Sequence, residues 1–215
     1  DECLKDMPKD IRKIIVENSN DHNLKDRLEN MYENTECFLM SDNLGYGKAN
    51  NFGIIKSNTD YVFILNPDTK ITDEKFTKIV SLLQEQDFAI AAPQIVEKNI
   101  VYKQNKSDHQ IKKVEHVFGM AMILNKRKFG NNFFDENIFL YHEEIDLCKR
   151  MINIGQNILE LNIQLNHLGN QSHGGYDFEM EKSRNWHWMW SKFYFYKKHH
   201  NYFYSFFKTL PNFLS

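Results

Sequence analysis

The sequence predicts an α/β fold in which a central sheet is flanked by helices, and three observations carry this prediction. Short apolar runs alternate with segments of helical periodicity through the first 86 residues, an order typical of a layered sheet with crossover helices. The apolar run at 61–65 is unbroken, as in a buried strand. A chain of 215 residues is also long enough to build a complete hydrophobic core.

The first part of the chain is expected to contain three strands and three full helices. Leu24, Leu28 and Met31 recur at helical spacing and indicate an amphipathic helix, whereas the loop DNLGYGKANNFGI opens the next helix. The predicted elements are the end of a helix at 1–4, strands at 14–16, 37–40 and 61–66, and helices at 22–33, about 46–57 and 72–86.

The second part of the chain mixes short strands with fewer helices. Gly119 interrupts the longest predicted strand, which indicates either a bulge or a close backbone approach to a ligand. The predicted elements are a strand at 88–93, a hairpin at 95–102 centred on Lys98-Asn99, a polar mobile loop at 103–113, a strand at 114–124, a helix at 143–153, a strand at 158–165 and a final aromatic helix from 178.

Composition excludes several classes of protein. The net charge of −2 argues against a nucleic-acid partner. Three cysteines without CxxC spacing predict neither a disulfide framework nor a zinc site. No apolar run reaches the ~18 residues that span a bilayer, and no secretory signal is visible, so we expect a cytoplasmic protein. We divide it into a catalytic domain at 1–175 and a helical extension at 176–215.

The first candidate site lies where the apolar strand ends, in YVFILNPDT. Pro67 fixes φ and has no N–H, so the strand must turn there and place Asp68 at the edge of the sheet. A carboxylate at such an edge suits Mg²⁺ or Mn²⁺, which bind one or two carboxylates plus substrate phosphates. The alternative is that Asn66 and Asp68 only build an Asx-type turn.

The second candidate site is the acidic cluster Glu143, Glu144 and Asp146 at the start of a predicted helix. Acidic residues in a first turn are favoured by the helix dipole, and Asp146 is spaced to pair with Arg150, so a purely structural role is one interpretation. The aromatic residues just before the cluster favour the other interpretation. A carboxylate in a partly apolar cleft has a raised pKa and can act as a general base.

Two weaker signals accompany these sites. In DNLGYGKANN, Gly45 and Gly47 allow the backbone to approach a ligand, and the following helix could point its amide groups at phosphates. The same glycines could simply permit a tight turn. His167, in LNHLGNQSHG, follows a strand and is either a structural histidine or a third contact to metal or phosphate.

The ordered motifs resemble those of family 2 glycosyltransferases of the GT-A fold, most closely the rhamnosyltransferase-like bacterial branch. The resemblance extends over about residues 2–200. It rests on the succession IIVENSND, DNLGYGKANNFGI, YVFILNPDT, HVFGMAMILNKRKF, FFDENIFLYHEEIDLCKR and HLGNQSHG.

This resemblance implies an inverting transfer of a sugar from a nucleotide-sugar to an acceptor hydroxyl, in the synthesis of a cell-surface polysaccharide or glycolipid. It implies Mg²⁺ or Mn²⁺ at Asp68 with His167 near the diphosphate, and Glu144 as the base beside Glu143 and Asp146. The positions that it implies along the nucleotide-sugar are Glu17, Asn18, Asn43, Gly45, Lys48, Asn51, Asn66 and Gly119.

The sequence differs from the family pattern at three places. The first strand of the family would precede residue 1, so we expect an N-terminally incomplete sheet with an exposed edge. Glu17 replaces an aspartate before Asn18, and Glu144 is one methylene longer than the usual aspartate. A non-catalytic sugar- or nucleotide-binding module of the same fold is therefore the alternative function. Nucleotidyl transfer is disfavoured because no phosphate loop rich in glycine and lysine is seen near the start of the chain.

The last stretch, FYFYKKHHNYFYSFF, combines aromatic residues with Lys197, Lys198, His199 and His200. Such a composition suits peripheral contact with the inner face of a membrane, where a lipid-linked acceptor would be found. A helix that caps the core, or a homodimer contact, is the alternative.

Overall fold

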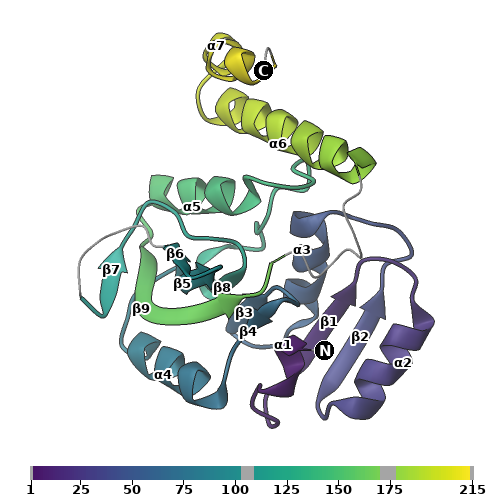
Figure 1. Cartoon of the computed structure of the whole chain (residues 1–215). Coiled ribbons are helices and arrows are strands. Elements are labelled where there is room, and N and C mark those ends of the chain that lie inside the picture. Colours follow the sequence, from purple (N-terminus) through teal and green to yellow (C-terminus); the bar gives the residue numbers. More distant parts are fainter. Residues whose placement is uncertain (1, 103–108, 170–177, 214–215) are drawn as a thin grey trace.

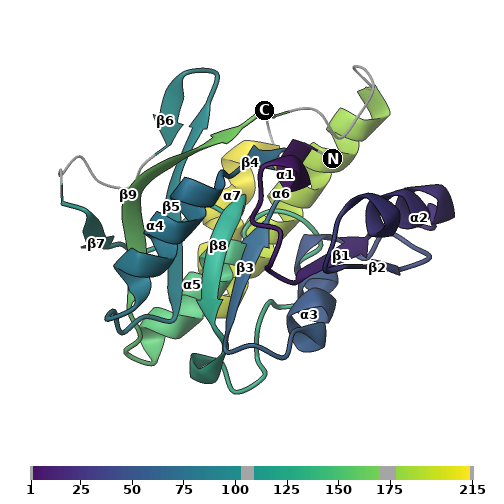
Figure 2. The same ribbon diagram turned by 90° about the horizontal axis from the view of Figure 1, so that it is seen from below.

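The computed structural model describes residues 2–102, 109–169 and 178–213. Its centre is a seven-stranded mixed sheet, which confirms the predicted fold class (Figures 1 and 2). The main path has the order β3 (Tyr61–Leu65), β8 (Ala121–Asn125), β5 (Ile90–Glu97), β9 (Ile158–His167) and β4 (Thr69–Lys70), while β6 (Ile100–Tyr102) pairs with β5 and β7 (Ile111–Lys113) with β9. Strands β5 and β9 run parallel, and every other ladder of this sheet is antiparallel.

The strands of this sheet are apolar on both faces because helices cover both. Helix α4 (Asp73–Leu83) lies on one face, and α3 (Tyr46–Lys56) and α5 (Glu143–Asn153) lie on the other (Figure 1). Successive residues of β8 therefore belong to different cores: Met122 and Leu124 pack with α5, and Ala121 and Ile123 pack with α4. This burial of both faces explains why the apolar runs in the sequence are nearly continuous.

The first two strands stand apart from the main sheet. Strands β1 (Lys13–Glu17) and β2 (Thr35–Leu39) pair in parallel, connected by α2 (His22–Met31), and a short helix α1 (Glu2–Lys5) precedes them. Asp21 begins α2 by accepting a hydrogen bond from the Leu24 N–H. No ladder among the described residues joins β1 or β2 to β3, whose partner is β8. The predicted elements are thus correct, but they do not form one continuous layer.

The expected strand at 114–124 was wrong in its first half. Strand β7 pairs with β9, whereas β8 lies between β3 and β5, so the chain must leave one side of the sheet and return at another. Residues 114–120 make this crossing without strand structure, and the strand begins only at Ala121. Residues 111–113, expected in a loop, form β7, and residues 103–108 of that loop lie outside the described residues.

The hairpin predicted at Lys98-Asn99 is confirmed, since both residues have positive φ in the turn between β5 and β6. The three cysteines are buried, and a 3₁₀ turn at Lys126–Lys128 follows β8.

The C-terminal segment forms two helices where one was expected, α6 (Phe178–His199) and α7 (Tyr202–Phe213). Asn201 separates them because its side chain accepts a hydrogen bond from the Tyr204 N–H and so begins α7. Helix α6 lies above α5, and α7 packs on the far side of α6 (Figure 1). No helix in the described part of the chain is long and apolar enough to cross a membrane. The proposed domain boundary at 175/176 lies outside the described residues.

Candidate active site

Asp68 lies in the turn between β3 and β4, as the Asn-Pro-Asp sequence predicts. The Thr69 N–H donates to the Asn66 carbonyl across the turn, and the Asp68 carbonyl accepts from the Leu168 N–H. In the β4–β9 ladder Thr69 lies opposite His167. This register brings Asp68 and His167, 99 positions apart in the sequence, side by side.

The Asp68 carboxylate is nearly buried, and one of its oxygens lacks a hydrogen bond. His167 Nε2 lies 3.1 Å from Oδ1, which is ion-pair distance, but the two groups are not aligned as a hydrogen bond. The other ring nitrogen of His167, Nδ1, lies 3.2 Å from Oε2 of Glu97 at the end of β5. A buried carboxylate oxygen without a donor is poorly solvated, so it would be stabilised by a cation.

Glu143 and Glu144 begin α5 after a turn of unusual conformation. Tyr141 and His142 both have positive φ, near 70°, which costs about 1–3 kcal/mol for each non-glycine residue. Helix α6 covers this turn: Ser191 Oγ donates to the Leu140 carbonyl at 2.7 Å, and Arg184 Nε donates to the Tyr141 hydroxyl at 3.0 Å. The helix therefore fixes the direction in which α5 starts.

The two glutamates have raised pKa values. Glu143 is 3% exposed, and burial, followed by the charge of Glu144, raises its pKa to about 8. Its Oε2 has no hydrogen-bond partner among the described residues. Burial also raises the pKa of Glu144, although backbone N–H groups at the helix start oppose the shift. A cluster that looked like three interchangeable acids in the sequence thus contains two desolvated carboxyl groups.

Gly119 and Met120 connect the Asp68 turn with the acidic start of α5. A Cβ placed on Gly119 would lie 3.8 Å from the Cβ of Glu144, so the base candidate lies directly against this backbone. The next residue, Met120, accepts hydrogen bonds at its carbonyl from the Asn66 N–H at 2.9 Å and the Thr69 hydroxyl at 3.4 Å, on either side of Asp68. The crossing segment therefore brings the aspartate turn and the glutamate helix to one region.

The end of β1 contributes the third part of the site. Asn18 bridges to the loop before α3: its Nδ2 donates to Asn43 Oδ1 at 2.8 Å, and its Oδ1 accepts from the Leu44 N–H at 2.8 Å. Glu17 accepts a hydrogen bond from the Ser19 hydroxyl. Tyr46, the first residue of α3, extends this loop to Gly119 by donating its hydroxyl to the Gly119 carbonyl at 2.5 Å. Lys48 is exposed on the first turn of α3.

Three residues of this loop that the sequence suggested for ligand binding make contacts within the protein. Gly45 has φ of 78°, and a Cβ there would lie 2.4 Å from the Phe139 carbonyl oxygen, so the backbone closely approaches the chain itself. A Cβ at Gly47 would likewise contact Phe134 at 3.1 Å. Asn51 is buried, accepting from the Phe134 N–H and donating to its carbonyl, both at 2.9 Å. These residues hold the 133–139 segment against α3, so the contacts of Asn51 favour a structural role.

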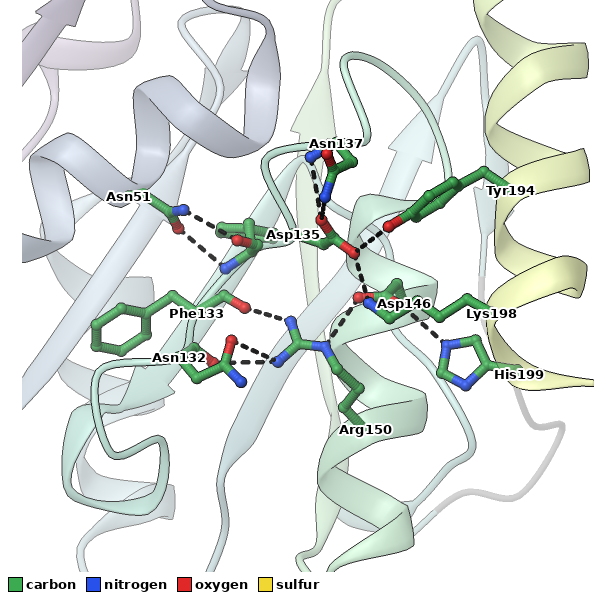
Figure 3. A network of polar contacts seen from close by, with 11 residues as sticks. Asn51, Asn132, Phe133, Asp135, Asn137, Asp146, Arg150, Tyr194, Lys198 and His199 are labelled. Atoms are coloured by element: carbon green, nitrogen blue, oxygen red, sulfur yellow. Dashed lines mark hydrogen bonds and ion pairs between the residues drawn. The ribbon is translucent and has the colours of Figure 1, made fainter.

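Asp146 also proves structural. It is fully buried and lies 2.9 Å from Arg150 Nε, 2.7 Å from Lys198 Nζ and 2.8 Å from His199 Nε2 (Figure 3). Lys198 also forms an ion pair with Asp135 at 2.6 Å. Burial raises the pKa of Asp135, but this ion pair and hydrogen bonds from Asn137 outweigh burial and lower the pKa to about 2. The network ties α6 to α5, so we assign Asp146 to the Arg150 pairing that the spacing predicted and not to catalysis.

Two residues of the site escaped the sequence analysis. Tyr46 stands between the two glycines of DNLGYGKANN, and its place within that motif was an available signal. Burial, followed by the charges of Glu144 and Glu143, raises its pKa well above the usual value. Glu97 ends a strand before a turn, and nothing in the sequence distinguishes it from an ordinary surface residue.

The comparisons with known proteins decide the family. The sequence model of glycosyl transferase family 2 matches residues 1–152. The chain belongs to glycosyl transferase family 2. A curated relative of this family 2 chain is the low-salt glycan biosynthesis hexosyltransferase Agl10 of Haloferax volcanii, which is 27% identical over 172 residues, or 66% of this chain and 55% of the relative. These comparisons do not confirm the predicted rhamnosyltransferase-like branch.

Solved structures support the GT-A fold. S. aureus TarS 1-349 in complex with UDP superposes with a TM-score of 0.63 at 16% identity, covering 78% of this chain and 55% of that one. GalNAc-T7 with UDP, GalNAc and Mn²⁺ superposes with a TM-score of 0.59 at 11% identity, covering 73% of this chain and 37% of that one. The chain thus spans about half the length of the curated relative and of TarS 1-349, and 37% of GalNAc-T7.

Proposed function

We propose that this family 2 chain transfers a sugar from a nucleotide-sugar to an acceptor hydroxyl with inversion at the anomeric carbon. The observation that carries the proposal is the convergence of an aspartate turn and a desolvated glutamate on the two sides of Gly119 and Met120. Such an arrangement suits a reaction in which the Asp68 turn holds the leaving diphosphate and Glu144 accepts a proton.

The residues at the aspartate turn fit a divalent ion. Oδ1 of Asp68 lacks a hydrogen-bond donor, and His167 adds a nitrogen 3.1 Å from it, a donor set that suits Mn²⁺ or Mg²⁺. The described part of the chain contains no group of three or more His, Cys, Asp or Glu side chains arranged to hold a metal. Asp68 would therefore hold the ion together with diphosphate oxygens and water, and the ion would neutralise the charge that develops on the leaving diphosphate.

Glu144 is the proposed base. Its desolvation raises its pKa, so the ionised carboxylate takes a proton more readily than an exposed glutamate does. Gly119 lies beside it, since a Cβ there would be in van der Waals contact with both Tyr46 and Glu144. We assign Glu143, which is more deeply buried, to a supporting role behind the base.

The substrates are proposed from the relatives. Agl10 is a hexosyltransferase of glycan biosynthesis, and TarS and GalNAc-T7 were solved with UDP. A UDP-hexose is therefore the first donor to test, with deoxyhexose nucleotides second, and a glycan or lipid-linked acceptor is expected.

The test is UDP release from a panel of nucleotide-sugars by the 215-residue chain, with Mn²⁺ or Mg²⁺. Glu144→Gln should lower turnover by roughly 10²–10⁴-fold while leaving UDP binding intact, since a general base contributes about that factor. Asp68→Asn should instead abolish the extra thermal stabilisation that UDP gives in the presence of Mn²⁺. Glu115→Gln, an exposed carboxyl change on the crossing segment, is the control and should alter neither readout.

The outcomes separate this proposal from its alternative. Full turnover in Glu144→Gln would refute the assigned base. Tight binding of nucleotide-sugars without turnover, in the presence of acceptors and metal, would favour the non-catalytic binding module.

A further inference from the structure

Helix α7 is arranged with its polar side inward. Ser205 and Thr209 are buried against α6, and the Ser205 hydroxyl donates to the Phe193 carbonyl at 2.6 Å. Asn212, on the same side of the helix, accepts a hydrogen bond from Lys192 Nζ at 2.9 Å. A surface helix in water normally buries its apolar face, so this packing is the reverse of the usual one.

A second side of α7 is aromatic and exposed. Phe203, Phe206 and Phe207 are 74%, 45% and 69% exposed and recur at the spacing of one helical face. Tyr202, 57% exposed, lies at the edge of this face, with its ring 5.8 Å from that of Phe193 on α6. Helix α7 is the outermost element, separated from the sheet by α6 (Figure 1). These side chains remain exposed to solvent in the described part of the chain. A continuous exposed apolar patch is typical of a surface that contacts an apolar partner.

The charge of this segment selects the partner. From residue 182 to residue 215 the sequence has no Asp or Glu but contains six basic residues: Lys182, Arg184, Lys192, Lys197, Lys198 and Lys208. Four of them are engaged within the protein: Lys182 by Glu179, Arg184 by Tyr141, Lys192 by Asn212, and Lys198 by Asp135 and Asp146. The other two, Lys197 and Lys208, are exposed. The tryptophans of α6 add to it, since Trp186 and Trp190 are also exposed. Aromatic residues combined with basic ones, without acids, are typical of segments that bind an anionic lipid surface.

We propose that α7 is an interfacial helix that lies in the headgroup region of an anionic membrane, with its aromatic face toward the acyl chains. The exposed lysines would contact lipid phosphates, and the Ser205 side would remain on α6. Neither helix needs to span the bilayer, in keeping with their length and composition. This proposal does not depend on the sugar-transfer reaction, because it rests on α6 and α7 alone.

The experiment is vesicle flotation with the 215-residue chain. Vesicles of phosphatidylglycerol and phosphatidylcholine in equal amounts should carry the protein upward, and vesicles of phosphatidylcholine alone should carry much less. Phe203→Ser/Phe207→Ser should lower the bound fraction by at least about tenfold, because it removes the two most exposed aromatic side chains. Lys197→Gln/Lys208→Gln should weaken binding and reduce its sensitivity to salt.

The matched control is Ile55→Ser/Ile154→Ser. These two residues are 71% and 63% exposed but belong to α3 and the end of α5, so the control removes a similar apolar surface elsewhere. Control protein that floats like the original supports the proposal. Absence of binding to anionic vesicles, or equal loss in the control, would overturn it. Sedimentation that shows a stable dimer, dissociated by Phe203→Ser/Phe207→Ser, would assign the face to a second copy instead and would also overturn it.

Discussion

The burial of Glu143 has a measurable consequence for stability. Its pKa is raised from 4.5 to about 8 in the folded protein, mainly by burial. Below pH 4.5 the carboxyl group is protonated in both states and does not oppose folding. Between 4.5 and 8 the folded state holds a proton that the unfolded chain releases, so stability falls as the pH rises.

The magnitude follows from the size of this shift. One pKa unit corresponds to about 1.4 kcal/mol, so the folded protein should lose about 1.4 kcal/mol per pH unit through this group. The side chain is 3% exposed, which leaves little screening by solvent. Glu143→Gln keeps the shape and removes the titration. Relative to this variant, the original protein should lose about 3 kcal/mol between pH 5 and pH 7.5.

The assay is urea denaturation at half-unit steps of pH for the original protein, Glu143→Gln and Glu85→Gln. Glu85 is exposed, so its amide variant should follow the original curve and corrects for other titrating groups. Parallel curves for the original protein and Glu143→Gln would show that Glu143 titrates normally. The assignment of a desolvated acidic pair at the start of α5 would then be wrong.

Three further substitutions test the structural corrections. Gly45→Ala should destabilise the protein by at least about 1–3 kcal/mol more than Gly155→Ala, because both have φ near 80° but only Gly45 faces a carbonyl oxygen; melting curves measure the difference. Asp146→Asn should cost roughly 3–5 kcal/mol since it removes a fully buried carboxylate that faces Arg150 and Lys198, whereas Asp87→Asn, at an exposed pair, should cost less than about 1 kcal/mol in urea titrations. Asn51→Ala should cost about 1–3 kcal/mol by the same method, with UDP affinity unchanged in calorimetry.

The sequence predicted most elements because their signals are local. The helix at 143–153 begins and ends as expected, since a run of acids precedes a clear apolar periodicity and Gly155 follows it. The prediction of a strand over 114–124 was wrong in its first half, because apolar residues indicate burial but do not indicate which strands pair with one another. Only the pairing of β8 with β3 and β5 decides that the strand begins at Ala121.

The positions of some candidate site residues in the fold could be predicted for the same reason. Asp68, His167 and Glu144 stand beside strand ends and helix starts, which are readable positions. The contact of Asn51 with Phe134 could not be predicted because the two residues are 83 positions apart. Glu97 was missed because only the β5–β9 pairing brings it to His167. Contacts between distant segments are therefore hard to predict from the sequence, and Asp68 and His167 were both singled out only because each stands next to the end of a strand.

The C-terminal helices connect these observations. Two successive left-handed residues, Tyr141 and His142, precede Glu143 and Glu144, and an isolated chain would relax from that conformation. Helix α6 holds the turn through Ser191 and Arg184 and holds α5 through the ion pairs of Asp146. The same helix carries α7 on its outer side. Since one rigid helix contacts both the turn before the proposed base and the proposed membrane helix, attachment at the membrane would fix the orientation of the acidic pair relative to the lipid surface.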